Sequence, residues 1–372
     1  MRIVFNTKKR HAPASAFYLN ALRKLDNIRT FDWEDYSRYD IALFMTYEED
    51  LADLKAAKER HSDLLVGLID PRGRQTLPYM EYVDFLIIDS IEMKDFFSFL
   101  QKPMFMYHEY PEIPVVQKSP SKRGRIVLGY HGNRTHLLSM YPNITGAIDL
   151  LGEQYDMEFW AVYNIKRDGE SASGLPRKVP VKHIQWHEEV YQDVLAQVDI
   201  GIAPGLVPIE SLAETKRSVR SPKHLVPGED DYLIRFKMPS NAGRLIVFGL
   251  LGLPVVSDFL PSYMQVIKDG ENGLLAYSSG GWYRALEALI TSADYRLELG
   301  RRLQETVVTR FGFPQQNKSF LAFCEGLLAD HRPKESLPFG PDSDGMSRRL
   351  DRGGERLRYA LRRFKRALFK VI

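Results

Sequence analysis

The sequence predicts an α/β protein with two doubly wound parallel sheets that face each other across a cleft, followed by a basic amphipathic helix. Short apolar runs alternate with segments of helical period along most of the 372 residues. This alternation is typical of parallel sheets that are covered on both faces. The segment Pro111–Gly124 is rich in Pro, Ser and Lys and divides the series in two. The chain length also favours two domains over one.

The predicted domain boundaries follow these changes in composition. They are an N-terminal domain at 1–115, a linker at 116–124, a C-terminal domain at 125–330, a flexible tether at 331–346 and a tail at 347–372. The expected N-terminal strands are Arg2–Phe5, Ile41–Phe44, Leu64–Ile69, Val83–Ile88 and Met104–Tyr107, with helices at Ala14–Leu25, Leu51–Arg60 and Ile91–Leu100. The expected C-terminal strands begin at Arg125 and include Met157–Val162, Val181–Trp186, Asp199–Ala203 and Pro254–Val256, with helices at Thr135–Leu151, Trp282–Ile290 and Tyr295–Phe311. Ligands of such sheets bind beyond the carboxyl ends of the strands.

Composition is that of a globular protein from a reducing compartment. Hydrophobic residues make up 44% of the chain and charged residues 27%, as in ordinary soluble domains. The one cysteine, Cys324, excludes an internal disulfide, and its apolar neighbours indicate a buried structural thiol. No apolar run approaches the roughly 20 residues that span a bilayer, and the N-terminus lacks the apolar core of a signal peptide. We therefore expect a cytoplasmic protein.

The segment Lys237–Asp258 carries the strongest indication of a binding site. It is predicted as a loop, a short helix and a buried strand, with Lys237, Asn241 and Arg244 in or just before the first helical turn. Ser240 or Asn241 is the expected N-cap. A helix N-terminus offers free N–H groups and partial positive charge, so cations beside it create a site that attracts phosphate. The alternative is a basic helix start that is simply solvated.

A glycine turn at the start of the C-terminal domain is the second candidate. The strand that begins at Arg125 runs into His131-Gly132-Asn133, where backbone N–H groups can approach a phosphate. His131 could hydrogen-bond a phosphate or a sugar hydroxyl, or it could be satisfied within the turn. The predicted phosphate site therefore comprises His131, Gly132, Lys237, Ser240, Asn241 and Arg244. The sequence has no G-x-G-x-x-G motif after the first strand, no Walker loop and no spacing of metal ligands.

Around this segment the sequence resembles the C-terminal half of group 1 glycosyltransferases with the GT-B fold, which consists of two facing Rossmann-like domains. The matching pattern is Lys237, a helix start, Gly-Leu-Pro-Val-Val from Gly252, Val-Ile-x-Asp-Gly-x-Asn-Gly-Leu-Leu from Val266, Trp-x-x-Ala-Leu from Trp282 and Arg-x-x-Leu-Gly from Arg296. It spans roughly residues 235–311, with weaker similarity from Arg125 onward. The resemblance implies a hexosyltransferase that binds a nucleotide-sugar donor at the predicted phosphate site and needs no metal or other cofactor.

Two positions depart from the family pattern. Many group 1 enzymes carry two glutamates eight positions apart across this helix, and Pro239 and Val247 stand there in this chain. Neither the glutamates nor the retaining stereochemistry is therefore carried over. If the enzyme inverts the anomeric centre, a carboxylate or histidine of the N-terminal domain should activate the acceptor. His108 and Glu109, together with His11 and Asp70, lie near predicted strand ends, and the sequence does not choose among them.

Two further segments concern the substrates. In similar proteins the strand that corresponds to Val181–Trp186 borders the nucleobase pocket, so Trp186 could stack on a base, or it could belong to the core. A long loop at 205–232 carries clustered basic and acidic residues. Loops of this length inside a compact domain are uncommon and often functional. This one could close over an acceptor or be a solvated insertion.

The tail at 347–372 concentrates positive charge. It holds ten Lys or Arg against two acidic residues, a net +8, so the remainder of a chain with a total charge of +3 carries −5. Apolar residues recur along the tail at helical spacing: Leu350, Leu357, Leu361, Phe364, Leu368 and Val371. Such a helix suits the surface of an anionic membrane. Docking on a partner helix and binding of nucleic acid are the alternatives, and the apolar face argues against nucleic acid.

These observations favour a bacterial-type glycosyltransferase of polysaccharide biosynthesis, peripheral on the inner face of the plasma membrane. It would transfer a sugar from a nucleotide diphosphate to a lipid-linked or cell-surface glycan. One rival is a nucleotide-sugar epimerase, for which a membrane tail would have little purpose. Another rival is a non-catalytic scaffold on a decayed transferase fold, which the missing glutamate pair keeps open.

Overall fold

The computed structural model describes residues 1–331 except positions 34, 72–73, 120–122, 172 and 206–240. The chain divides into two compact units, Met1–Glu325 and Gly326–Ile372, and both sheets lie in the first unit. Several predicted features lie outside the described residues: Lys237, Ser240, the loop from position 206, the tether beyond His331 and the tail at 347–372.

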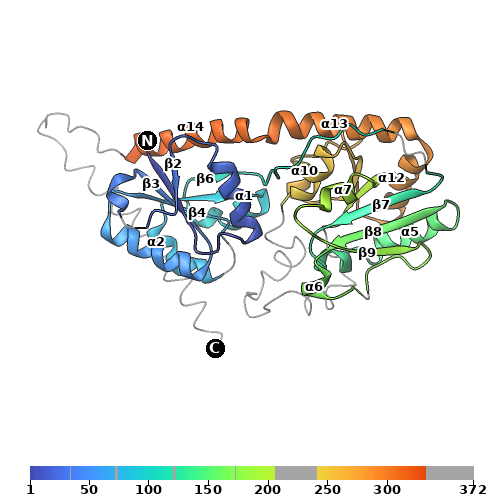
Figure 1. The fold of residues 1–372 in the computed structure, drawn as a ribbon, viewed down its shortest axis with the longest axis horizontal. Helices are drawn as coiled ribbons and strands as arrows, with labels where there is room; N and C mark the ends of the chain where they lie inside the picture. The colour runs from blue at the N-terminus through green and yellow to red at the C-terminus, as the bar shows by residue number, and fades with distance from the viewer. Residues whose placement is uncertain (34, 72–73, 120–122, 172, 206–240, 332–372) are drawn as a thin grey trace, which may run out of the picture. The chain divides into compact units, whose positions relative to one another are not determined.

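The N-terminal sheet has six parallel strands in the order β2-β1-β3-β4-β5-β6 (Figure 1). Their bounds are β1 Ile3–Asn6, β2 Ile28–Thr30, β3 Ile41–Met45, β4 Leu65–Ile69, β5 Phe85–Ile88 and β6 Met104–Met106. Every residue of β1, β3, β4 and β5 is buried, as in strands covered on both faces. The five predicted strands are confirmed. Strand β2 was not predicted, because Ile28 is its one buried residue.

Helices connect these strands much as the apolar periodicity predicts. They are α1 Pro13–Leu22, α2 Glu48–Arg60 and α3 Ile91–Phe96, with 3-10 turns η1 Tyr36–Arg38, η2 Arg74–Tyr82 and η3 Ser98–Leu100. The helix predicted at Ile91–Leu100 is shorter than expected, because a 3-10 turn replaces its end. Acidic residues in the first turn of α2 and basic residues in its last turn complement the helix dipole.

The C-terminal sheet also has six parallel strands, in the order β12-β11-β10-β7-β8-β9. Their bounds are β7 Ile126–His131, β8 Met157–Tyr163, β9 Val181–Gln185, β10 Ile200–Ala203, β11 Val255–Asp258 and β12 Leu274–Ala276. The chain runs outward from β7 through β8 and β9 and then crosses to β10 on the other side of β7. The strand order therefore reverses at β7, and ligands of open α/β sheets bind at the carboxyl end of this switch point.

The helices of this second sheet include two departures from prediction. Their bounds are α4 Thr135–Leu138, α5 Asn143–Gly152, α6 Ile165–Asp168, α7 Tyr191–Leu195, α10 Gly243–Leu250, α11 Pro261–Met264, α12 Ser279–Thr291, α13 Ala293–Phe311 and α14 Phe313–His331. The single helix expected at Thr135–Leu151 is divided into α4 and α5, because Pro142 has no N–H to donate within a helix. Helix α14 was not predicted. It buries Cys324, and this burial raises the thiol pKa to about 12.

Helix α10 is the buried element that leads into the candidate site. All residues from Leu245 to Leu250 are buried, as in a helix that is apolar on every side. A Cβ added to Gly249 would lie 2.7 Å from Val307 of α13, and one added to Gly201 of β10 would lie 2.8 Å from the Phe248 ring. The backbone of α10 is therefore fixed between a helix and a strand.

None of the described helices is long and apolar enough to cross a bilayer.

Candidate functional site

The turn after β7 begins with a glycine, Gly132. Gly132 has φ +136°, and a Cβ there would lie 2.9 Å from Tyr130 Oη and 3.4 Å from Arg244 Cδ. Its N–H donates to the Val162 carbonyl of β8. A side chain at this position would fill the space beside Arg244, so the sequence needs glycine here both for its conformation and for its small size.

Arg244 is the central side chain of the site. It belongs to the first turn of α10, and its guanidinium lies between the rings of Tyr130 and Tyr263, 5.8 and 5.7 Å from their centroids. Its Nη2 donates to His136 Nδ1 at 3.3 Å. Its Nη1 is buried and has no hydrogen-bond partner among the described residues. Leaving a buried donor unpaired costs about 1–3 kcal/mol, and more for a charged group, so this atom indicates an absent acceptor.

Two other buried polar atoms beside Arg244 also lack partners in the part of the chain that the structure describes. They are His131 Nε2 and Tyr263 Oη. Burial, followed by the charge of Arg244, lowers the pKa of His131 to about 3. Burial raises the pKa of Tyr263 to about 12. At neutral pH the imidazole is therefore uncharged and the phenol keeps its proton. The site presents a cation and a phenolic O–H as hydrogen-bond donors beside a neutral imidazole, and an anion with several acceptor oxygens would satisfy the two donors.

Asn241 orients the start of α10. The helix begins at Gly243 with Ala242 as its N-cap, so the prediction of an N-cap at Ser240 or Asn241 is wrong by one or two positions. Asn241 Oδ1 nevertheless accepts the Gly243 N–H at 3.0 Å, and Asn241 Nδ2 donates to Asp89 Oδ2 at 3.0 Å. Its side chain thus satisfies a free helix N–H from just outside the helix.

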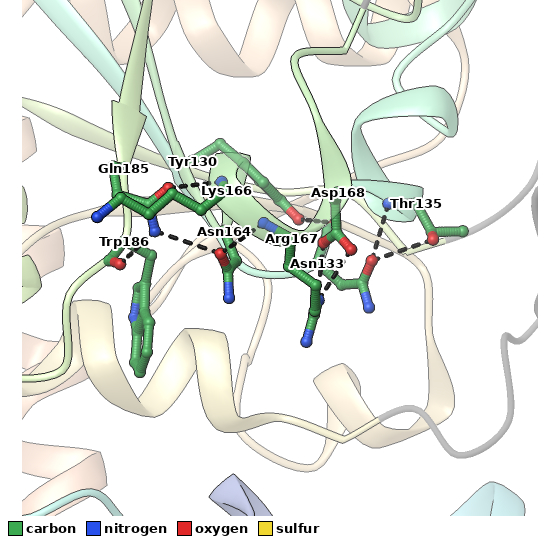
Figure 2. Close-up of polar contacts among 9 residues, drawn as sticks. All are labelled: Tyr130, Asn133, Thr135, Asn164, Lys166, Arg167, Asp168, Gln185 and Trp186. Carbon is green, nitrogen blue, oxygen red and sulfur yellow. Dashed lines mark hydrogen bonds and ion pairs between the residues drawn. The ribbon is translucent and has the colours of Figure 1, made fainter.

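A polar network lines the carboxyl ends of the neighbouring strands (Figure 2). Asn164 Oδ1 accepts from Arg167 N and from Gln185 Nε2, and Gln185 Oε1 accepts from Lys166 N. Figure 2 also shows the Trp186 ring extending beyond this edge. That ring is half-buried and lies 5.8 Å from the Tyr191 ring at an interplanar angle of 31°. Both amide oxygens and the Gln185 amide nitrogen have partners within the network, which fixes the loops after β8 and β9.

The two candidate bases have different environments. His108 is held by Gln316, which accepts from its backbone N–H at 2.7 Å and donates to its carbonyl at 2.9 Å. Burial, followed by the charge of Arg310, lowers the His108 pKa to about 4. Glu109 instead lies beside Gly243, because a Cβ added to Gly243 would be 3.1 Å from Glu109 Oε2. The structure thus brings Glu109, and not His108, to the start of α10.

The other two candidate bases are not brought to Arg244 by any described contact. His11 is exposed, and Asp70 is buried at the end of β4 with φ +53°. Among the described residues, no group of three or more His, Cys, Asp or Glu side chains is placed to hold a metal ion.

Two open grooves elsewhere on the described surface are less suited to a ligand. One, of about 390 Å³, borders Lys118, whose Nζ already donates to two carbonyls at 2.6 Å. The other, of about 660 Å³, borders Lys268, which pairs with Glu271 at 2.6 Å. Arg244 borders neither groove, and its unpaired donor makes it the better candidate.

The sequence did not indicate three residues of this site. Tyr130 and Tyr263 hold the guanidinium of Arg244, and Asp89 holds Asn241. Tyr130 was within reach of prediction, because it directly precedes His131 at a strand end. Asp89 directly follows the predicted strand Val83–Ile88, so its place at a strand end was predictable, but its contact with Asn241 was not, because only the tertiary fold brings Asp89 and Tyr263 to α10.

Comparison with known proteins gives the class of fold. No protein-family model and no curated protein sequence matches the chain. Among solved structures, Anabaena HepE in complex with UDP has a TM-score of 0.59 at 12% identity, with 88% of this chain and 100% of HepE covered. Sucrose-phosphate synthase from Thermosynechococcus elongatus gives 0.56 at 9% identity, with 89% and 100% covered. Trehalose-6-phosphate synthase OtsA gives 0.52 at 11% identity, with 87% and 99% covered.

The chain therefore has the GT-B fold, with two six-stranded parallel sheets flanked by helices. This confirms the predicted α/β fold class and the resemblance to GT-B glycosyltransferases. At identities of 9–12% the likeness concerns the fold.

The protonation state of His131 gives a direct test of this geometry. Because its pKa is lowered to about 3 from an ordinary value of 6.5, the ring should stay neutral between pH 7 and 5. The unfolded chain binds the proton more readily, so the contribution of His131 to the free energy of unfolding should fall as the pH is lowered from about 6.5 toward 3. Imidazole NMR of the wild type and His131→Gln, which assigns the signal, measures this. A His131 signal that titrates near 6.5 would contradict the buried placement.

Proposed function

We propose that the protein is a glycosyltransferase that takes a sugar from a nucleoside-diphosphate donor. The observation that carries the proposal is the pair of buried donor atoms, Arg244 Nη1 and Tyr263 Oη, that have no partner among the described residues and lie at the switch point of a GT-B sheet. A diphosphate supplies several acceptor oxygens and negative charge at one place. Arginine matches phosphate geometry well because its planar guanidinium can donate two parallel hydrogen bonds.

The chemistry follows from where charge develops. As the bond between the sugar and the diphosphate breaks, negative charge grows on the leaving oxygen, and donors that are already in place stabilise it without reorganisation. Arg244 is held by two tyrosine rings and by His136, so its guanidinium is oriented before the ligand arrives. We assign Lys237 and Ser240, which precede Asn241 in the chain, to the same diphosphate on the basis of the sequence.

Uridine is the nucleoside that we favour for the donor. Anabaena HepE has been determined with UDP and with UDP-glucose, and we extend that ligand class to this chain. Trp186 and Tyr191 offer an aromatic surface at the edge of the same sheet, on which a base could stack. A hexose is the expected sugar, and no metal is assigned a role.

Glu109 is the residue that we propose as catalytic base. Its carboxylate lies beside Gly243, which directly precedes Arg244 in the chain. The backbone of His108 is instead held by Gln316, and its ring packs against Phe311.

The acceptor would be a lipid-linked or cell-surface glycan, and the basic tail at 347–372 would hold the enzyme on the inner face of the plasma membrane.

The buried Val247, at a position where many group 1 enzymes carry a glutamate, favours a second candidate, a non-catalytic scaffold that still binds nucleotide.

Removal of the Arg244 side chain tests the donor site. We expect Arg244→Ala to raise the Kd for UDP by about 10- to 100-fold, because hydrogen bonds to charged groups contribute about 1.5–3 kcal/mol. Lys237→Ala should weaken binding as well. Isothermal titration calorimetry of the folded variants measures both. The matched control is Arg284→Ala, an exposed arginine of α12, and equal affinity in wild type and Arg244→Ala would refute the phosphate assignment.

The membrane proposal predicts that residues 347–372 decide vesicle binding. The full chain should float with anionic liposomes, and a chain ending at residue 346 should remain in the dense fraction, because the tail supplies a net charge of +8 and an apolar face. Neutral liposomes and added salt should both reduce flotation of the full chain. Equal flotation of the two chains on anionic vesicles would exclude the tail as an anchor.

A further inference from the structure

Two buried carboxylates lie in the short segment that leads from β5 into α3. Asp89 is 1% exposed and Glu92 is 2% exposed. Between them, Ser90 caps α3 by accepting the Met93 N–H at 3.2 Å. A capped helix start fixes the directions in which Asp89 and Glu92 project. This segment follows the N-terminal sheet, yet both carboxylates bond to elements that follow strands of the C-terminal sheet.

Asp89 holds the start of α10. Its Oδ2 accepts from Asn241 Nδ2 at 3.0 Å, and Asn241 Oδ1 accepts the N–H of Gly243 at 3.0 Å. Gly243 directly precedes Arg244, so two hydrogen bonds separate the Asp89 carboxylate from the backbone that carries the guanidinium.

Glu92 holds the segment that carries Tyr263, the second ring beside Arg244. Its Oε1 accepts the backbone N–H of Ser262 at 3.0 Å. Ser262 directly precedes Tyr263, whose ring lies 5.7 Å from the Arg244 guanidinium and whose buried Oη has no partner within residues 1–331 as far as they are described. Burial raises the pKa of Glu92, while the Ser262 N–H opposes that shift. The carboxylate is thus retained in a place that disfavours its charge, which is consistent with a demand for that bond.

We propose that Asp89 and Glu92 are a clamp of two positioning residues that assemble the anion site. Asp89 holds the start of α10, which carries Arg244, and Glu92 holds the segment that carries Tyr263, whose ring lies beside the guanidinium. The two bonds reach the two elements that define the guanidinium environment, and both originate from one rigid segment. Displacement of that segment by about an ångström would lengthen both bonds beyond hydrogen-bonding distance. Affinity for a diphosphate is then set partly by residues that do not touch it. This inference rests on the proposed nucleotide-binding function.

Substitution at Asp89 tests the clamp. Asp89→Leu should raise the Kd for UDP about tenfold, because it fills the space but cannot accept from Asn241. Asp89→Asn retains an acceptor oxygen and should bind within about threefold of wild type. In the Arg244→Ala background, Asp89→Leu should have almost no further effect on the Kd, because its action passes through Arg244. A merely structural role would lower stability and leave the affinity of the folded fraction unchanged in both backgrounds.

The corresponding pair of variants at Glu92 tests the clamp if Asp89→Leu does not fold. Glu92→Leu should weaken UDP binding about tenfold and Glu92→Gln should restore it, with calorimetry and circular dichroism on the same samples. If wild type binds no UDP, the proposed function fails. If wild type binds UDP and Arg244→Ala weakens binding, but the folded Leu variants bind like wild type, the clamp is refuted while the proposed function stands.

Discussion

The guanidinium of Arg244 lies beside the rings of Tyr130 and Tyr263, and its buried Nη1 has no partner among the described residues; this is the constraint on which the site depends. A charged donor in that position is unfavourable in the empty protein. It is tolerated because the two rings stabilise the cation and because α10, which carries it, is buried along its whole apolar length. The stability of the surrounding core thus maintains a local arrangement that only an anion completes.

The sheet topology explains why this arrangement forms at β7. The strand order reverses there, and ligands of such sheets bind at the carboxyl ends of the strands at this point. Gly132 lets Tyr130 Oη and Arg244 pack against the turn after β7, because a Cβ there would lie 2.9 Å from the one and 3.4 Å from the Cδ of the other. At the neighbouring strands, Asn164 follows β8 and Gln185 ends β9, and their hydrogen bond fixes the loops that begin there.

Much of this fold could be predicted from the sequence, and the exceptions have physical reasons. The apolar runs at Ile41–Met45 and Leu65–Ile69 are buried on both faces, so they stand out from their polar flanks. Strand β2 buries only one of its three residues and gives no such run. The division between α4 and α5 follows from Pro142, a helix-breaking residue whose signal was present and was overlooked. Of the candidate site, His131, Gly132, Asn241 and Arg244 could be predicted because they stand at a strand end or a helix start. Tyr263, Asp89 and Glu92 were not, because their role depends on contacts between residues far apart in the chain.

The affinity difference between UDP and uridine tests the central claim most directly. If Arg244 and its neighbours bind the diphosphate, UDP should bind the full-length protein at least about a hundredfold more tightly than uridine, since only UDP offers charged acceptors to the guanidinium. Calorimetric titration with both ligands in the same buffer gives this ratio. Equal affinities for UDP and uridine would contradict the account, because the energy of binding would then come from the nucleoside alone.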